Sequence, residues 1–127
     1  MLVFGQPKIE NKEIIEVLKT LKSGWLGTGP KVNKFEKFIS KYKKIKNTIA
    51  VNSCTAALHL SLLAIKINKG DEVILPSMTF AATANAVIHA GGKPIFADCE
   101  IETMNIDVKD IVKKITKRTK AIIPVHF

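Results

Sequence analysis

Short apolar runs alternate with helical patterns over residues 47–127. The runs are TIAVN (48–52), EVILP (72–76), KPIFAD (93–98) and AIIPVH (121–126). Runs with so little polar alternation are typical of parallel strands that are covered on both faces. Between them, apolar residues at helical spacing predict helices over about 54–66, 79–90 and 107–116. This alternation predicts an α/β fold, a β-α-β-α-β-α-β unit with right-handed crossovers.

The first 46 residues follow a different pattern. Apolar positions three and four residues apart predict amphipathic helices over about 10–21 and 30–44. Between them lies SGWLGTGP (23–30), whose three glycines surround Trp25 and indicate a loop that carries an aromatic side chain. We therefore expect an N-terminal helical arm over 1–46 and a parallel-sheet domain over 47–127.

Composition narrows the class of protein. With 127 residues and 46% apolar composition, the chain is long enough for one domain with a core. It contains no apolar run long enough to cross a membrane and no signal-peptide pattern, which favours a cytoplasmic location. Cys54 and Cys99 are too few for a disulfide framework and lack the neighbours of a metal site, so we expect reduced thiols and no metal.

The net charge of +9 raises the question of nucleic-acid binding. Of the twenty basic residues only Arg118 is Arg, whereas base recognition relies on the bidentate guanidinium group. The densest basic run, residues 34–46, alternates Lys with apolar residues at helical spacing, as a solvated helix face does. We therefore do not expect nucleic acid as a partner.

Ligands of open parallel sheets bind beyond the carboxyl ends of the strands, which selects residues 52–56, 76–80 and 98–105. At 52–56 a strand gives way to a helix, so free N–H groups and the positive helix end coincide beside Thr55. Either an anion binds there, or Ser53 or Thr55 caps the helix, and the segment alone leaves both open. At 76–80, Phe80 either stacks on a planar ligand or packs in the core.

Nucleophilic catalysis by Cys54 would need a nearby base. His59 lies on the same helix and is expected to face another way. His89 and His126 have no partner at a recognisable spacing, so structural roles are expected for them. The chain also lacks a P-loop and a GxGxxG motif.

Four segments, in order and at natural spacing, resemble one enzyme family. They are SGWLGTGPKVNKFEKFIS, AVNSCTAALHLSLLAI, GDEVILPSMTFAATANAVIHAGGKPIFADCEIETMNID and ITKRTKAIIPVHF. They look like the N-terminal blocks of the DegT/DnrJ/EryC1/StrS aminotransferases. The resemblance implies a pyridoxal 5'-phosphate (PLP) enzyme that transfers an amino group from an amino acid to a nucleotide-linked keto sugar, as in cell-surface polysaccharide or amino-sugar biosynthesis. It also implies the large domain of fold type I PLP enzymes, a smaller C-terminal domain and a homodimer.

The resemblance assigns roles to residues of this chain. SCTAAL (53–58) matches the phosphate-binding turn, so Thr55 and the N–H groups of Thr55 and Ala56 would hold the cofactor phosphate. Cys54 stands in that turn where the family often has Gly. Phe80, in MTFAAT (78–83), matches the aromatic residue that stacks on the pyridine ring. Trp25 and Thr28 match the block near the sugar nucleotide.

Two groups that transamination requires have no match among these residues. In the family, the lysine that carries the cofactor and the carboxylate on the pyridine nitrogen both lie downstream of PVH. We therefore expect the N-terminal portion of such an enzyme, without its C-terminal domain, without catalytic residues and inactive as it stands. The alternatives are a non-catalytic remnant and a basic module that binds phosphate or nucleic acid.

Overall fold

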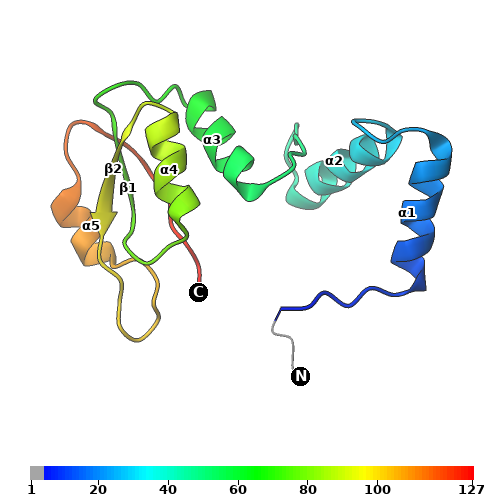
Figure 1. Ribbon diagram of the computed structural model, residues 1–127. Helices are drawn as coiled ribbons and strands as arrows, with labels where there is room; N and C mark the ends of the chain where they lie inside the picture. Colours follow the sequence, from blue (N-terminus) through cyan, green and yellow to red (C-terminus); the bar gives the residue numbers. More distant parts are fainter. Residues whose placement is uncertain (1–4) are drawn as a thin grey trace. The chain divides into compact units, whose positions relative to one another are not determined.

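The computed structural model describes residues 5–127, which form two compact units (Figure 1). Unit 1 ends at Ala50, and unit 2 comprises Val51–Phe127. None of the helices within residues 5–127 is both long and apolar enough to cross a bilayer.

Unit 1 contains the two predicted amphipathic helices, α1 (Asn11–Ser23) and α2 (Pro30–Lys43). A capping box begins α1, in which the Glu10 N–H donates to Glu13 Oε2 at 2.8 Å. Gly24, with φ 74°, ends it in the left-handed conformation that glycine adopts without steric cost. Neither helix buries a residue, and most apolar side chains of both helices are exposed.

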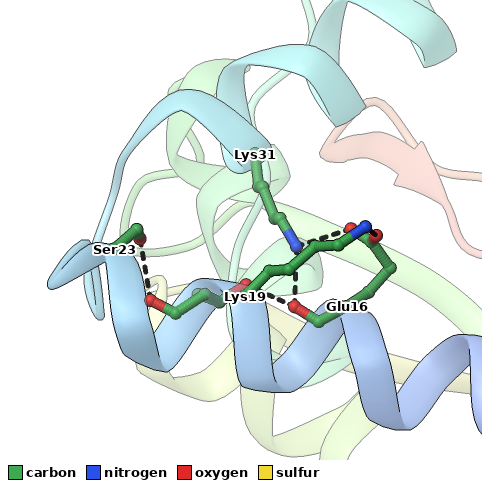
Figure 2. A network of polar contacts seen from close by, with 5 residues as sticks. Glu16, Lys19, Ser23 and Lys31 are labelled. Atoms are coloured by element: carbon green, nitrogen blue, oxygen red, sulfur yellow. Dashed lines mark hydrogen bonds and ion pairs between the residues drawn. The ribbon is translucent and has the colours of Figure 1, made fainter.

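A charged network joins α1 to α2 (Figure 2). Lys31 Nζ lies 2.7 Å from both the carboxylate and the backbone carbonyl oxygen of Glu16, and Lys19 Nζ lies 2.7 Å from the other carboxylate oxygen. Hydrogen bonds from Lys19 and then Lys31 lower the pKa of Glu16 to about 2. These groups are all exposed, so water screens the attraction, and the network fixes geometry more than it adds stability.

Unit 2 alternates helix and strand. Its elements are α3 (Cys54–Ala64), β1 (Glu72–Pro76), α4 (Ala81–His89), β2 (Lys93–Ala97), α5 (Val108–Lys114) and β3 (Thr119–Ile122). The strands form a parallel sheet in the order β2-β1-β3, with Glu72 opposite Lys93 on one side and Thr119 on the other. The α/β class and the parallel sheet predicted from the sequence are therefore confirmed.

The central strand β1 separates two apolar clusters. Val73 and Leu75 join Leu62 of α3 and Val87 of α4 on one face of the sheet. Ile74 points to the other face, where it joins a cluster with Ala97, Ile106 and Ile111 of α5. All five residues of β1 are buried, whereas β2 and β3, at the edges, are partly exposed.

A tight turn fits α4 against the start of β2. A Cβ atom added to Gly92 would lie 2.8 Å from Ile67 Cγ2 and 3.2 Å from Val87 Cγ1. The position therefore requires glycine because the apolar cluster closes over its backbone.

The strand predicted over 48–52 is absent, and that prediction was wrong. Its groups pair within unit 1 instead, because the Ala50 N–H donates to Glu36 Oε1 at 2.8 Å and the Thr48 hydroxyl lies 2.8 Å from that of Ser40. Ile49 remains 78% exposed. An apolar run becomes a strand only where a neighbouring strand receives its backbone groups, and a side chain takes that place here.

A buried carboxylate joins the start of β1 to the turn before β3. The Glu72 side chain is only 3% exposed and accepts hydrogen bonds from the Thr116 hydroxyl at 2.6 Å and from Arg118 Nη2 at 2.7 Å. The Thr116 hydrogen bond is the largest influence on the pKa of Glu72. Burial opposes it, Arg118 adds to it, and the pKa lies below its ordinary value of 4.5.

The lowered pKa predicts a pH-dependent contribution of Glu72 to stability. That contribution is present above the unfolded pKa and is lost as the pH falls through the folded pKa. We expect Glu72→Gln to lower the urea midpoint at about pH 7 and to flatten its decline toward about pH 3. The exposed Glu102→Gln serves as control and should keep the wild-type curve. Parallel curves for wild type and Glu72→Gln would contradict the assignment.

Candidate active site

The candidate site lies at the edge of unit 2 where the strands end. Because the strands are parallel, their carboxyl ends share one edge of the sheet. Figure 1 shows α3 and α4 beginning at the end toward which β1 and β2 run. The fold therefore brings the Thr55 region and Phe80, which lie 25 positions apart in the sequence, to the same end of the unit.

Capping accounts for part of the α3 N-terminus. Ser53 is the N-cap, and its hydroxyl accepts from the Ala56 N–H at 3.1 Å. The Ala57 N–H donates to the Ser53 carbonyl at 3.1 Å. The N–H groups of Cys54 and Thr55 donate to no acceptor within residues 5–127. The cap therefore leaves the Cys54 and Thr55 donors unused at the positive end of the helix.

The residues around these donors leave room for an anion. Cys54 and Thr55 are exposed, and the small side chain of Ala56 is half-buried. A phosphate can thus approach the two N–H groups and the Thr55 hydroxyl together, so the donor set fits a phosphate.

Phe80 begins the neighbouring helix. It is the N-cap of α4, and its carbonyl accepts from the Thr83 N–H at 3.0 Å. Its side chain is 81% exposed, which excludes the core-packing alternative within unit 2. Beneath it, the hydroxyls of Thr79 and the buried Thr83 lie 2.8 Å apart and fix the turn. The ring is thus an exposed flat surface on a fixed backbone, suited to stacking on a planar ligand.

The third strand end, at Asp98, is occupied by structural contacts. Asp110 Oδ2 accepts from the Asp98 N–H at 2.7 Å and from Lys114 Nζ at 2.6 Å. The hydrogen bond from Lys114, followed by that from the Asp98 N–H, lowers the pKa of Asp110. Asp98 Oδ1 in turn accepts from the Cys99 N–H at 2.8 Å. This part of the edge ties α5 to β2.

In unit 1, Trp25 borders an open hollow of about 610 Å³ that the sequence did not indicate. The Trp25 ring lies over Gly29, where an added Cβ would be 3.1 Å from it. Asn33, Lys34 and Lys37 of α2 complete the wall together with Pro30. Thr28, which the resemblance pairs with Trp25, is exposed and does not line this hollow. The sequence feature that could have indicated Lys34 and Lys37 is their spacing of three residues, which places both on one side of a helix just after the glycine-rich loop.

Two histidines that lie 30 positions apart in the sequence are neighbours in the fold. The ring centroids of His59 on α3 and His89 on α4 lie 6.2 Å apart. Within residues 5–127, no group of three or more His, Cys, Asp and Glu side chains is arranged to hold a metal ion.

The sequence model of the DegT/DnrJ/EryC1/StrS aminotransferase family matches residues 7–127. The chain belongs to this family. The resemblance drawn from the motifs is confirmed over almost the whole sequence.

Three family relatives show which proteins the chain is similar to. The spore coat polysaccharide biosynthesis protein SpsC of Bacillus subtilis is 51% identical over 99% of this chain and 32% of its own length. The UDP-4-amino-4-deoxy-L-arabinose–oxoglutarate aminotransferase of Shewanella sediminis is 42% identical over 96% of this chain and 31% of its own. The solved PMP form of Spr1654 from Streptococcus pneumoniae has a TM-score of 0.91 at 41% identity, over 97% of this chain and 31% of its own.

The chain therefore spans about a third of the length of these DegT/DnrJ/EryC1/StrS relatives. Its fold is the N-terminal part of the large domain of a fold type I PLP-dependent transferase.

Two substitutions separate the cap from the proposed anion site. Ser53→Ala removes the acceptor of the Ala56 N–H and should lower the free energy of unfolding by about 1 kcal/mol. Thr55→Ala removes an exposed hydroxyl and should change it by less than about 0.5 kcal/mol. Urea denaturation of both variants is the measurement. Equal losses would mean that Thr55 contributes to the helix start and not only to a ligand.

Proposed function

We propose that residues 1–127 belong to a PLP-dependent aminotransferase that acts on nucleotide-linked keto sugars and that they hold the cofactor. The observation that carries the proposal is the pair of unused N–H donors of Cys54 and Thr55 at the start of α3, together with the exposed ring of Phe80 at the start of α4. The names of the relatives support the substrate class, since one includes a UDP-linked amino sugar and another polysaccharide biosynthesis.

In this proposal, the start of α3 holds the cofactor phosphate. The N–H groups of Cys54 and Thr55 and the Thr55 hydroxyl donate to its oxygens, and the positive end of the helix favours its charge. The Ala56 N–H can join them only if the phosphate displaces the Ser53 hydroxyl, which now accepts from it at 3.1 Å. The displaced hydroxyl can turn and donate to the same phosphate.

Phe80 holds the cofactor ring in this proposal. Its exposed side chain would stack on the pyridine ring of the cofactor and would exclude water from it. PLP, when bound, supplies the electron sink that lets an amino group move between an amino acid and a keto sugar. Residues 1–127 contribute no matched proton-transferring lysine, so we propose that they do not catalyse transamination by themselves.

The hollow beside Trp25 is proposed as a contact for the sugar nucleotide. Trp25 offers a ring for the base, and Lys34 and Lys37 offer two positive charges for a diphosphate. We also propose that an amino acid donates the amino group and that the whole enzyme is a homodimer. Phosphate binding without catalysis is the second candidate, since the proposed phosphate contacts do not require a lysine that carries the cofactor.

The cofactor site can be tested without interference from surface lysines. Pyridoxine 5'-phosphate has no aldehyde and cannot react with an amine, so it reports only the noncovalent contacts. We expect Thr55→Ala to weaken its binding about tenfold through loss of a charge-assisted hydrogen bond, and to leave pyridoxine unchanged. We expect Phe80→Ala to weaken both ligands about three- to tenfold. Equilibrium dialysis of the full chain measures all four combinations.

Matched controls exist in the same chain. Ser61→Ala removes an exposed hydroxyl from α3 away from its start, and Phe38→Ala removes an exposed ring from α2. Both controls should bind pyridoxine 5'-phosphate as the wild type does. A Thr55→Ala variant that binds it equally well would contradict the phosphate site.

The hollow in unit 1 is tested with UDP. Replacing both Lys34 and Lys37 with Gln should weaken UDP binding about five- to tenfold, because two exposed charges near a diphosphate are lost. The matched control replaces Lys41 and Lys43, which lie on the same helix outside the hollow, and should change binding less than about twofold. Isothermal titration calorimetry measures both. If both double variants lost the same affinity for UDP, the overall charge of α2 would explain the effect, and the proposed contact in the hollow would be wrong.

A further inference from the structure

A pair of imidazoles bridges two helices of unit 2, away from the helix starts that form the candidate cofactor site. His59 lies in the middle of α3 and is half-buried, and His89 is exposed at the last position of α4. Their ring centroids lie 6.2 Å apart, with the ring planes inclined by 56°. These planes are tilted, so the rings are not in a flat stack.

We propose that His59 and His89 bind one divalent transition-metal ion, such as Zn²⁺, Ni²⁺ or Cu²⁺, through one ring nitrogen each. Neutral imidazole is the commonest protein ligand of these ions. No role in the cofactor or sugar-nucleotide contacts uses either residue, so this site does not depend on the proposed function.

The separation of the rings fits one shared ion. With a metal–nitrogen bond of about 2.1 Å, an ion lies roughly 3 Å from the centre of each ring, and two rings on one ion have centres at most about 6.5 Å apart. The observed 6.2 Å is close to that limit, at which the two nitrogens lie almost opposite each other, so the rings must approach to about 5 Å to share a tetrahedral ion. His89 is exposed and can rotate about its side-chain bonds to direct a nitrogen toward the ion.

The scaffold holds the two backbones at this spacing without the metal. Leu62 of α3 and Ala86 and Val87 of α4 belong to one buried cluster, so the helices are already packed together. Binding of an ion to both rings therefore costs little conformational entropy, because the two helices are already ordered. Within residues 5–127 no third protein ligand is grouped with the pair, so water fills the other positions and the ion exchanges with solvent.

Binding should stabilise unit 2. An ion that binds the folded pair and not the unfolded chain shifts the folding equilibrium by mass action. The order of affinity should follow the nitrogen-ligand series, with Cu²⁺ bound more tightly than Ni²⁺.

The test uses the full chain without an affinity tag. Copper at a small fraction of the protein concentration should broaden the NMR signals of the His59 and His89 imidazoles and leave those of His126 sharp. His126 lies beyond β3 and provides an internal control. Equal broadening of all three rings would overturn the proposal, because it would mean nonspecific binding.

Variants supply a second readout. By nickel titration calorimetry, His89→Asn and His59→Asn should each weaken binding roughly tenfold or more, and His126→Asn should not change it. His89 is exposed, so its replacement should leave the metal-free unfolding curve unchanged and separate loss of a ligand from loss of the fold. Wild-type affinity in His89→Asn would overturn the site, as would an equal loss in His126→Asn.

Discussion

The burial of β1 on both faces is the constraint on which the rest of unit 2 depends. All five of its residues are buried, so helices must cover both faces and strands must pair with both edges. The ladder extends past the strand, since the Ser77 N–H donates to the Ala97 carbonyl and the Ile123 N–H to the Ile74 carbonyl, each at 2.8 Å. A buried carboxylate at the start of such a strand requires partners, and Thr116 and Arg118 supply them from the turn that leads into β3. The amino end of β1 is thus held by polar contacts, and at the carboxyl end Asp110 ties the end of β2 to α5, whereas the Phe80 side chain after β1 is exposed.

The sequence pattern predicted correctly those elements whose side chains are buried by neighbouring helices and strands in the fold. EVILP became β1 at the predicted positions because its apolar side chains fill two clusters at once. TIAVN is also a short apolar run, but it has no strand beside it, and the Glu36 carboxylate accepts from the Ala50 N–H. Strand pairing is a property of two segments, so a single apolar run cannot specify it.

Contacts between distant segments also decided which candidate site residues could be predicted from the sequence. Thr55 and Phe80 were selected from the sequence because each follows a predicted strand, but only the strand before Phe80 forms, and the start of α3 follows an irregular segment. His59 and His89 were missed as a pair because their proximity follows from the packing of α3 on α4, which no spacing rule covers. The sequence pattern predicts that Lys34 and Lys37 lie on a solvated face, and both are exposed, but Trp25 and Gly29 line the same hollow.

The cap and the anion site at α3 are compatible because a helix start has more donors than one cap can use. Four N–H groups lack helical partners at any α-helix start, and the Ser53 side chain satisfies one of them here. The Cys54 and Thr55 donors can therefore bind a ligand while the helix keeps its cap. Because α3 also carries His59, a phosphate at its start and a metal ion at its middle would stabilise the same helix. Unless one ligand shifts α3, the two sites should act independently, since each binds groups that the fold already holds in place.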